Sequence, residues 1–227
     1  MAATADPPGD SPGVDRSSLF YDTWIDWLVA GLLALEGLVV AWFGVTVAGD
    51  VDRAFAEEVA AEFLSGPDAA SFPLTEPEFA DAVYAVATWA GWGLAVAGVL
   101  TVAAGIWFRR YRVDVRDQLA AGRPAPRWHA PLLGGLLGTA LVFVPLVQVL
   151  AGVVAGALSD RSATLDGALS GVVFGAPAYA VWAAVVVGVL VAGLPSVALA
   201  LVFLFLIYFV VDVVLGAVGG LVGGLLS

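Results

Sequence analysis

Long apolar runs interrupted by short polar stretches are the dominant pattern of the chain. Runs at 24–49, 80–108, 131–158, 170–193 and 196–216 are each long enough to cross a hydrocarbon core about 30 Å thick, which takes about 20 helical residues. Pro145 lies inside the third run and predicts a kink. We therefore expect an all-α, polytopic transmembrane helical bundle of about five spans, forming one domain over residues 23–227.

The polar stretches between these runs differ in character. Residues 1–22 are rich in Pro, Gly and Asp and predict a disordered tail. Residues 50–79 are acidic, and Phe55, Val59 and Phe63 recur at helical spacing within them. This spacing predicts an amphipathic helix over 51–64, on the outer membrane surface or over the mouth of the bundle. The helix of the second span is expected to continue past the membrane until Gly122 ends it.

Basic residues are concentrated in one loop, and this sets the expected orientation. Six of the nine basic residues lie between the second and third runs. Because short cytoplasmic loops carry an excess of Lys and Arg, this loop and the N-terminus are expected in the cytoplasm, in a multi-pass protein of the plasma membrane. The same arginines could bind anionic lipid headgroups. They are Arg109, Arg110, Arg112, Arg116, Arg123 and Arg127.

The side of the membrane that holds the C-terminus stays open. Five crossings would leave the C-terminus outside and would make the turn at 193–195 cytoplasmic, although this turn carries no charge. If one element is re-entrant or breaks in two, the C-terminus moves inside. The last run, which would continue to Ser227, is longer than a membrane requires, so tilting or a break at Gly219-Gly220 is expected.

Composition supports a membrane protein and excludes several other classes. Hydrophobic residues make up 61% of the chain and the mean hydropathy is +0.96, far from soluble averages. The net charge of -11 argues against binding of nucleic acid, and of anionic lipid over most of the surface outside the basic loop. The chain has no Cys, Lys or Asn, and this acidic, lysine-free composition resembles that of proteins from salt-loving archaea.

No catalytic, cofactor or metal motif was found in the sequence. His129 is the single histidine and the chain has no cysteine, so neither a metal site nor a catalytic triad is expected. Glycines at 134, 135, 138 and in the C-terminal run predict helix packing surfaces, which could also hold a protein partner or a second copy of the chain.

Intramembrane polar residues are the best functional candidates. Glu36 is expected at the membrane centre, with Thr139, Tyr179 and Tyr208 as neutral partners at a similar depth. Asp212 is expected near the outer boundary and Asp26 at an interface, both solvated. Two function classes remain open: a scaffold, accessory or lipid-contacting bundle, and a proton- or cation-coupled transporter or channel that uses Glu36.

Overall fold

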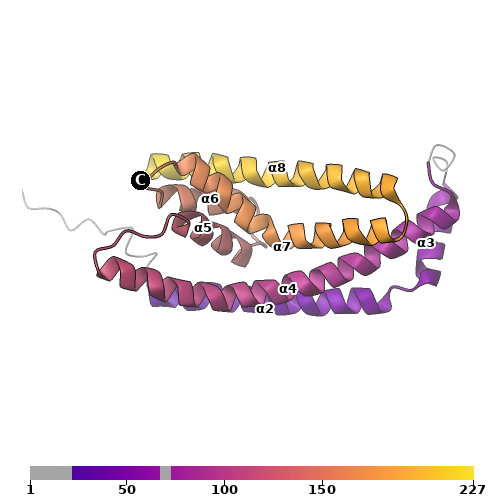
Figure 1. Ribbon diagram of the computed structural model, residues 1–227, viewed down its shortest axis with the longest axis horizontal. Coiled ribbons are helices and arrows are strands. Elements are labelled where there is room, and N and C mark those ends of the chain that lie inside the picture. The colour runs from indigo at the N-terminus through magenta and orange to yellow at the C-terminus, as the bar shows by residue number, and fades with distance from the viewer. Residues whose placement is uncertain (1–21, 67–72) are drawn as a thin grey trace, which may run out of the picture.

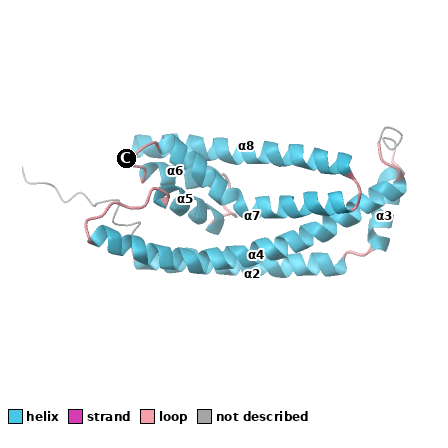
Figure 2. Ribbon diagram, viewed as in Figure 1, coloured by secondary structure: helices cyan, strands magenta, loops and turns pink. Residues whose placement is uncertain are grey.

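A computed structural model describes residues 22–66 and 73–227, and within these ranges every regular element is an α-helix (Figure 2). The predicted all-α bundle is therefore confirmed, with four helices of membrane-spanning length and a shorter apolar one. The tail predicted over 1–22 lies almost entirely outside the described residues. The helices are α2 (Thr23–Asp50), α3 (Arg53–Leu64), α4 (Glu76–Ala120), α5 (His129–Ala140), α6 (Val147–Ala157), α7 (Ala163–Val191) and α8 (Pro195–Leu226).

The long helices form two antiparallel pairs that lie side by side (Figure 1). One pair is α2 with α4, and the other is the hairpin of α7 with α8. The short helices α5 and α6 lie beside the α7–α8 pair at one end of the bundle, and α3 lies at the opposite end (Figure 1). We call these the basic end, which carries residues 109–127, and the acidic end, which carries α3.

Glycine allows the helices of each pair to approach closely. A Cβ atom at Gly37 of α2 would lie 2.5 Å from the carbonyl oxygen of Gly98 on α4. A Cβ atom at Gly167 of α7 would likewise overlap the carbonyl oxygen of Gly216 on α8, and so would one at Gly152 of the neighbouring helix α6. Because lipid tails are as apolar as the helices, such close packing is a main source of helix association in a membrane. The glycine surfaces predicted from the sequence are thus used within the chain.

The third apolar run differs from the single kinked span expected over 131–158. It forms two helices, α5 and α6, which are antiparallel because Gly134 lies against Ala155 while Gly138 lies against Ala151. Pro145 has no N–H to donate, and Leu146 adopts a left-handed conformation with φ of 59°. The chain therefore reverses at 141–146, and the hairpin returns to the basic end.

This hairpin decides where the C-terminus lies. With four long helices crossing and the hairpin returning, Ser227 lies at the basic end, where it lines a cavity together with Arg116 and Arg127 (Figure 1). The turn at 192–194, in which Gly193 has φ of 79°, lies at the acidic end. It does not lie beside the arginines as five crossings would require. Helix α8 is continuous, without the break considered at Gly219-Gly220.

The helix ends follow local sequence signals. Helix α4 ends at Ala120, two residues before Gly122, whose φ is 70°. Asp52 caps α3 by accepting a hydrogen bond from the Phe55 N–H at 2.8 Å. The face of α3 that is buried against the bundle consists of the small residues Ala56 and Ala60. The expected apolar face of Phe55 and Phe63 is half exposed, although the Phe63 ring stacks on Phe79 of α4 with centroids 4.9 Å apart.

Candidate functional site

A buried ion cluster joins the two helices of the first pair at the basic end. Asp26 of α2 accepts a hydrogen bond from Arg112 Nε at 2.8 Å through Oδ1, and one from Arg116 Nη1 through Oδ2. Arg112 is fully buried and Asp26 is 2% exposed. The expectation that Asp26 is solvated was therefore wrong, because α4 covers it with two arginines one turn apart. Arg112 and Arg116 form part of the packed structure and do not serve only as topology signals.

His129 extends this cluster to the hairpin. As the first residue of α5 it precedes the apolar part of that helix, and its Nε2 lies 3.4 Å from Arg112 Nη1. Burial and the Arg112 charge lower the pKa of His129 from its usual 6.5 to about 4, although the Asp26 charge acts in the opposite direction. The imidazole is therefore neutral at pH 7 and its Nε2 can accept from Arg112. Tyr111 packs beside the ring, with centroids 5.8 Å apart.

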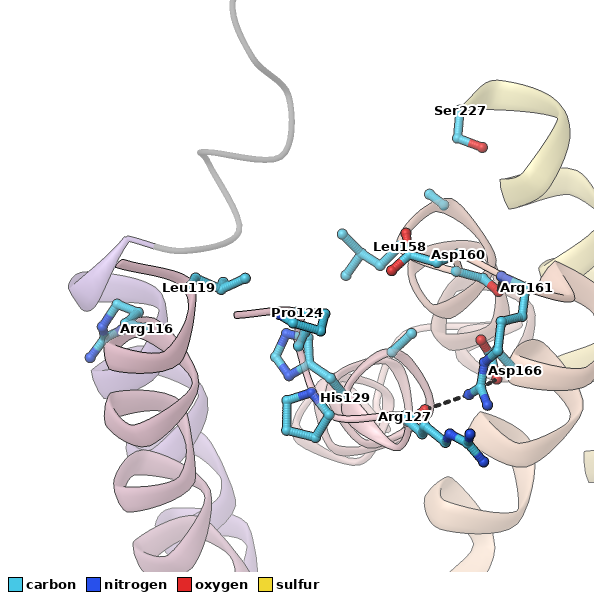
Figure 3. Close-up of a pocket in the computed structure, with 15 residues that line it drawn as sticks. Arg116, Leu119, Pro124, Arg127, His129, Leu158, Asp160, Arg161, Asp166 and Ser227 are labelled. Atoms are coloured by element: carbon cyan, nitrogen blue, oxygen red, sulfur yellow. Dashed lines mark hydrogen bonds and ion pairs between the residues drawn. The ribbon is translucent and has the colours of Figure 1, made fainter. Parts of the chain in front are cut away.

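The other arginines of the basic end border two open cavities. A cavity of about 1020 Å³ lies between α4, the hairpin and the start of α7 (Figure 3). Its wall carries Arg161, whose guanidinium donates to the Arg127 carbonyl oxygen at 2.8 Å and lies 3.9 Å from Asp166 (Figure 3). The carboxylates of Asp160 and Asp166 thus offset part of the positive charge of this cavity. Arg123 is exposed in the nearby loop.

The second cavity is a groove of about 710 Å³ on the outer face of the α2–α4 pair. Its floor is made of small residues, among them Gly31, where a Cβ atom would meet nothing within 4 Å. Arg109 lies at its rim with the guanidinium 3.7 Å from the centre of the Trp27 ring. Arg110, also at the rim, forms no ion pair or hydrogen bond within the described part of the chain. The groove therefore combines an apolar floor with an available cation.

Glu36 is placed as expected in the middle of α2, but the three expected partners bond elsewhere. Its Oε2 is buried and forms no hydrogen bond with any described residue. The Thr139 hydroxyl donates to the Gly135 carbonyl oxygen at 3.0 Å and approaches that of Phe174. Tyr179 and Tyr208 lie in the other helix pair. Depth along a helix can be counted from the sequence, whereas the direction in which a side chain faces depends on which helices become neighbours.

Asp212 is the polar centre of the α7–α8 pair. It is fully buried, and its Oδ2 accepts a hydrogen bond from the Tyr179 hydroxyl at 3.0 Å. Gln148, in the first turn of α6, approaches the carboxyl group, while Oδ1 has no hydrogen-bond partner in the described chain. Tyr208 packs edge-on against Tyr179. The expectation of a solvated Asp212 was wrong, because Gly171 and Gly175 let α7 pack directly over it.

Sequence reasoning identified most of these residues but not their groupings. The pairing of Asp26 with Arg112 and Arg116 was missed, although the i, i+4 spacing of the two arginines and the charge at the start of the first run were visible signals. Among residues 22–66 and 73–227, no group of three His, Cys, Asp or Glu side chains could hold a metal ion.

Comparison with known proteins concerns the second half of the molecule. Residues 128–226 match the model of a family of unknown function, DUF5518. The match begins one residue before α5 and ends with α8, so it covers the hairpin and the α7–α8 pair and leaves out the α2–α4 pair. No curated protein and no solved structure matches the chain. The chain is therefore a multi-pass helical membrane protein whose last four helices are similar to that family.

Proposed function

We propose that the protein is a scaffold or accessory subunit of the plasma membrane that contacts anionic lipid through its basic end, which faces the cytoplasm. The observation that carries this proposal is that Glu36 lines none of the four described cavities. The cavity nearest the centre of the bundle has a volume of about 190 Å³ and is lined mostly by apolar side chains, and Glu36 is not among them.

The polar groups of this central cavity are already bonded. Its two threonines, Thr101 and Thr139, each donate to a carbonyl oxygen one turn earlier in their own helix, at 2.9 and 3.0 Å. A mostly apolar cavity whose hydroxyl donors are already used offers few partners to a water molecule. A transporter needs a hydrated path to its ionisable group, so the mostly apolar interior supports a scaffold.

Contact with anionic lipid is supported by the groove beside Arg110. Its floor of Ala30, Gly31, Ala34 and Gly105 is wide enough for an acyl chain in this proposal. Arg109 and Arg110 supply two positive charges at its rim against the single carboxylate of Asp114. Juxtamembrane arginines attract anionic headgroups by about 1 kcal/mol each. We expect Arg110→Gln to reduce the phosphatidylglycerol that remains bound after purification, as counted by native mass spectrometry. Arg53→Gln, at the acidic end, is the control; equal loss or no loss in both variants contradicts lipid binding in the groove.

One observation favours the second function class, a proton- or cation-coupled transporter or channel. Asp212, Tyr179 and Gln148 meet beside the reversal between α5 and α6, and broken helices near the membrane centre are typical of transporters. Proteoliposomes that contain the purified protein test the two classes with pH-sensitive and cation-sensitive dyes. The scaffold proposal expects no flux above that of empty liposomes. A wild-type flux that Glu36→Gln or Asp212→Asn abolishes would refute it and favour transport.

A further inference from the structure

The turn between α5 and α6 leaves irregular backbone exposed on the surface of the bundle, which does not suit a lipid environment. We call residues 141–146 the hairpin tip. This segment is irregular, with Pro145 at its end and Leu146 in the left-handed conformation. Helical backbone satisfies its own hydrogen bonds in lipid, whereas an irregular segment does not.

The hairpin tip lies about 16 Å along the bundle from the basic end. Ala140 is 11 residues beyond His129, which corresponds to about 16 Å along a helix. Next to Ala140, the Thr139 hydroxyl lies 3.5 Å from the carbonyl oxygen of Phe174. Phe174 is 11 residues, or about 16 Å, beyond the first residue of α7, so both helices reach the same level there. Half of a hydrocarbon core is also about 15 Å thick, so a membrane whose surface lies at the starts of α5 and α7 has its centre at the tip.

Several backbone groups of the hairpin tip have no hydrogen-bond partner in the described structure. They are the N–H groups of Phe143 and Leu146 and the carbonyl oxygens of Val142, Phe143 and Pro145. The tip is also open to the surroundings, since Phe143 is 73% and Leu146 69% exposed. Each unsatisfied group in hydrocarbon costs several kcal/mol, so lipid does not cover this surface in the membrane.

Water is also a poor occupant of this surface. The side chains that surround the free backbone groups belong to Val142, Phe143, Val144 and Leu146, all of them apolar. The described cavities that hold charged side chains lie at the basic end, and the tip lines none of the four described cavities. Protein is left as the cover that supplies both hydrogen-bond partners and apolar contact.

We propose that a second copy of this chain covers the hairpin tip, in a dimer whose two-fold axis passes between the two tips. The tip carries both free donors and free acceptors, so two tips related by a two-fold axis can satisfy each other. The glycine faces, the other candidate contact between copies, are occupied within the chain. The contact would lie two residues from Gln148 and so beside the buried Asp212. The inference holds for either function class.

A crosslinking experiment tests this contact, and the cysteine-free chain makes it clean. Phe143→Cys is compared with Leu35→Cys on α2, an exposed position (62%) close to Leu33, which packs with Leu136 and Ala140 near the tip. Both variants are reconstituted at low density in vesicles of phosphatidylglycerol and treated with a short bismaleimide. We expect a covalent dimer with Phe143→Cys and none with Leu35→Cys.

Two further measurements keep the inference falsifiable if a variant misfolds. Single-molecule photobleaching of the wild-type chain, labelled at the N-terminus in the same vesicles, should show two copies in each complex. A single copy at all protein densities overturns the proposal. Rapid reaction of Phe143→Cys with a membrane-impermeant charged thiol reagent would also overturn it, because the tip would then line a water-filled path and support transport.

Discussion

Removing the Asp26 carboxylate should destabilise the bundle more than any exposed charge substitution. In Asp26→Asn the side chain keeps its shape, but Arg112 is left fully buried without its counter-charge, and Arg116 loses the same partner. Breaking a buried ion pair by removal of one partner costs about 3–5 kcal/mol, because the remaining charge stays out of water. We therefore expect Asp26→Asn to lower the free energy of unfolding by about 3–5 kcal/mol.

The measurement is equilibrium unfolding in mixed detergent and SDS micelles, followed by near-UV circular dichroism of the eight tryptophans. Asp81→Asn is the matched control, since Asp81 pairs with Arg53 at 2.5 Å in an exposed ion pair at the acidic end. Exposed pairs contribute little to stability, so this variant should unfold like the wild type.

A second substitution separates loss of the charge from other effects. Arg112→Met in the Asp26→Asn background removes the uncompensated cation and should recover part of the lost stability. If Asp26→Asn unfolds within 1 kcal/mol of the wild type, or if Arg112→Met gives no recovery in that background, the buried cluster does not hold α2 against α4 as described.

Three other predictions concern packing, pH and topology. Gly152→Ala places a methyl group against the Gly216 carbonyl oxygen and should lower the free energy of unfolding by about 1–3 kcal/mol in the same assay. Gly31→Ala is the control, because a Cβ atom at Gly31 meets nothing within 4 Å and should not destabilise the bundle. Equal effects of the two substitutions would contradict the close approach of α6 and α8. The pKa of His129 is lowered to about 4 in the folded chain, so between pH 6.5 and pH 4 the unfolded chain binds a proton that the folded chain does not bind. The free energy of unfolding should therefore fall by up to about 3 kcal/mol as the pH is lowered through this range. The His129→Gln variant should lose this pH dependence. In sealed vesicles, Ser227→Cys and Gly193→Cys should react with an impermeant maleimide from opposite sides; labelling from one side would refute four crossings.

Much of the architecture could be predicted because it depends on properties of each segment alone. Whether residues 24–49 cross a membrane depends on their own length and hydropathy, and the helix that continues past Phe108 ends near Gly122 for local backbone reasons. The concentration of arginines between the second and third runs is equally a property of the sequence. These features do not require knowledge of which helices are neighbours.

The groupings of polar residues could not be predicted in the same way. Glu36 lies mid-helix as counted, yet Tyr179 faces Asp212 and Thr139 bonds within its own segment. Successive residues of a helix point in directions about 100° apart, so residues at nearly the same depth can face different neighbours. Which polar groups meet therefore depends on how the helices pack. Asp26 and Asp212 were placed in solvent because their depth was counted without the helices that cover them.

The sequence alone determined that this is an acidic, multi-pass helical membrane protein with a basic end, because hydropathy, helix length and charge are summed along the chain. Only the tertiary structure decided that the third apolar run folds back as a hairpin, that Ser227 returns to the basic end, and that Asp26 and Asp212 are buried. The physical reason is that these outcomes depend on contacts between residues far apart in the chain. The close approach of Gly152 to Gly216 forms only when α6 packs against α8. In the same way, the ion pair of Asp26 with Arg112 forms only when α2 packs against α4.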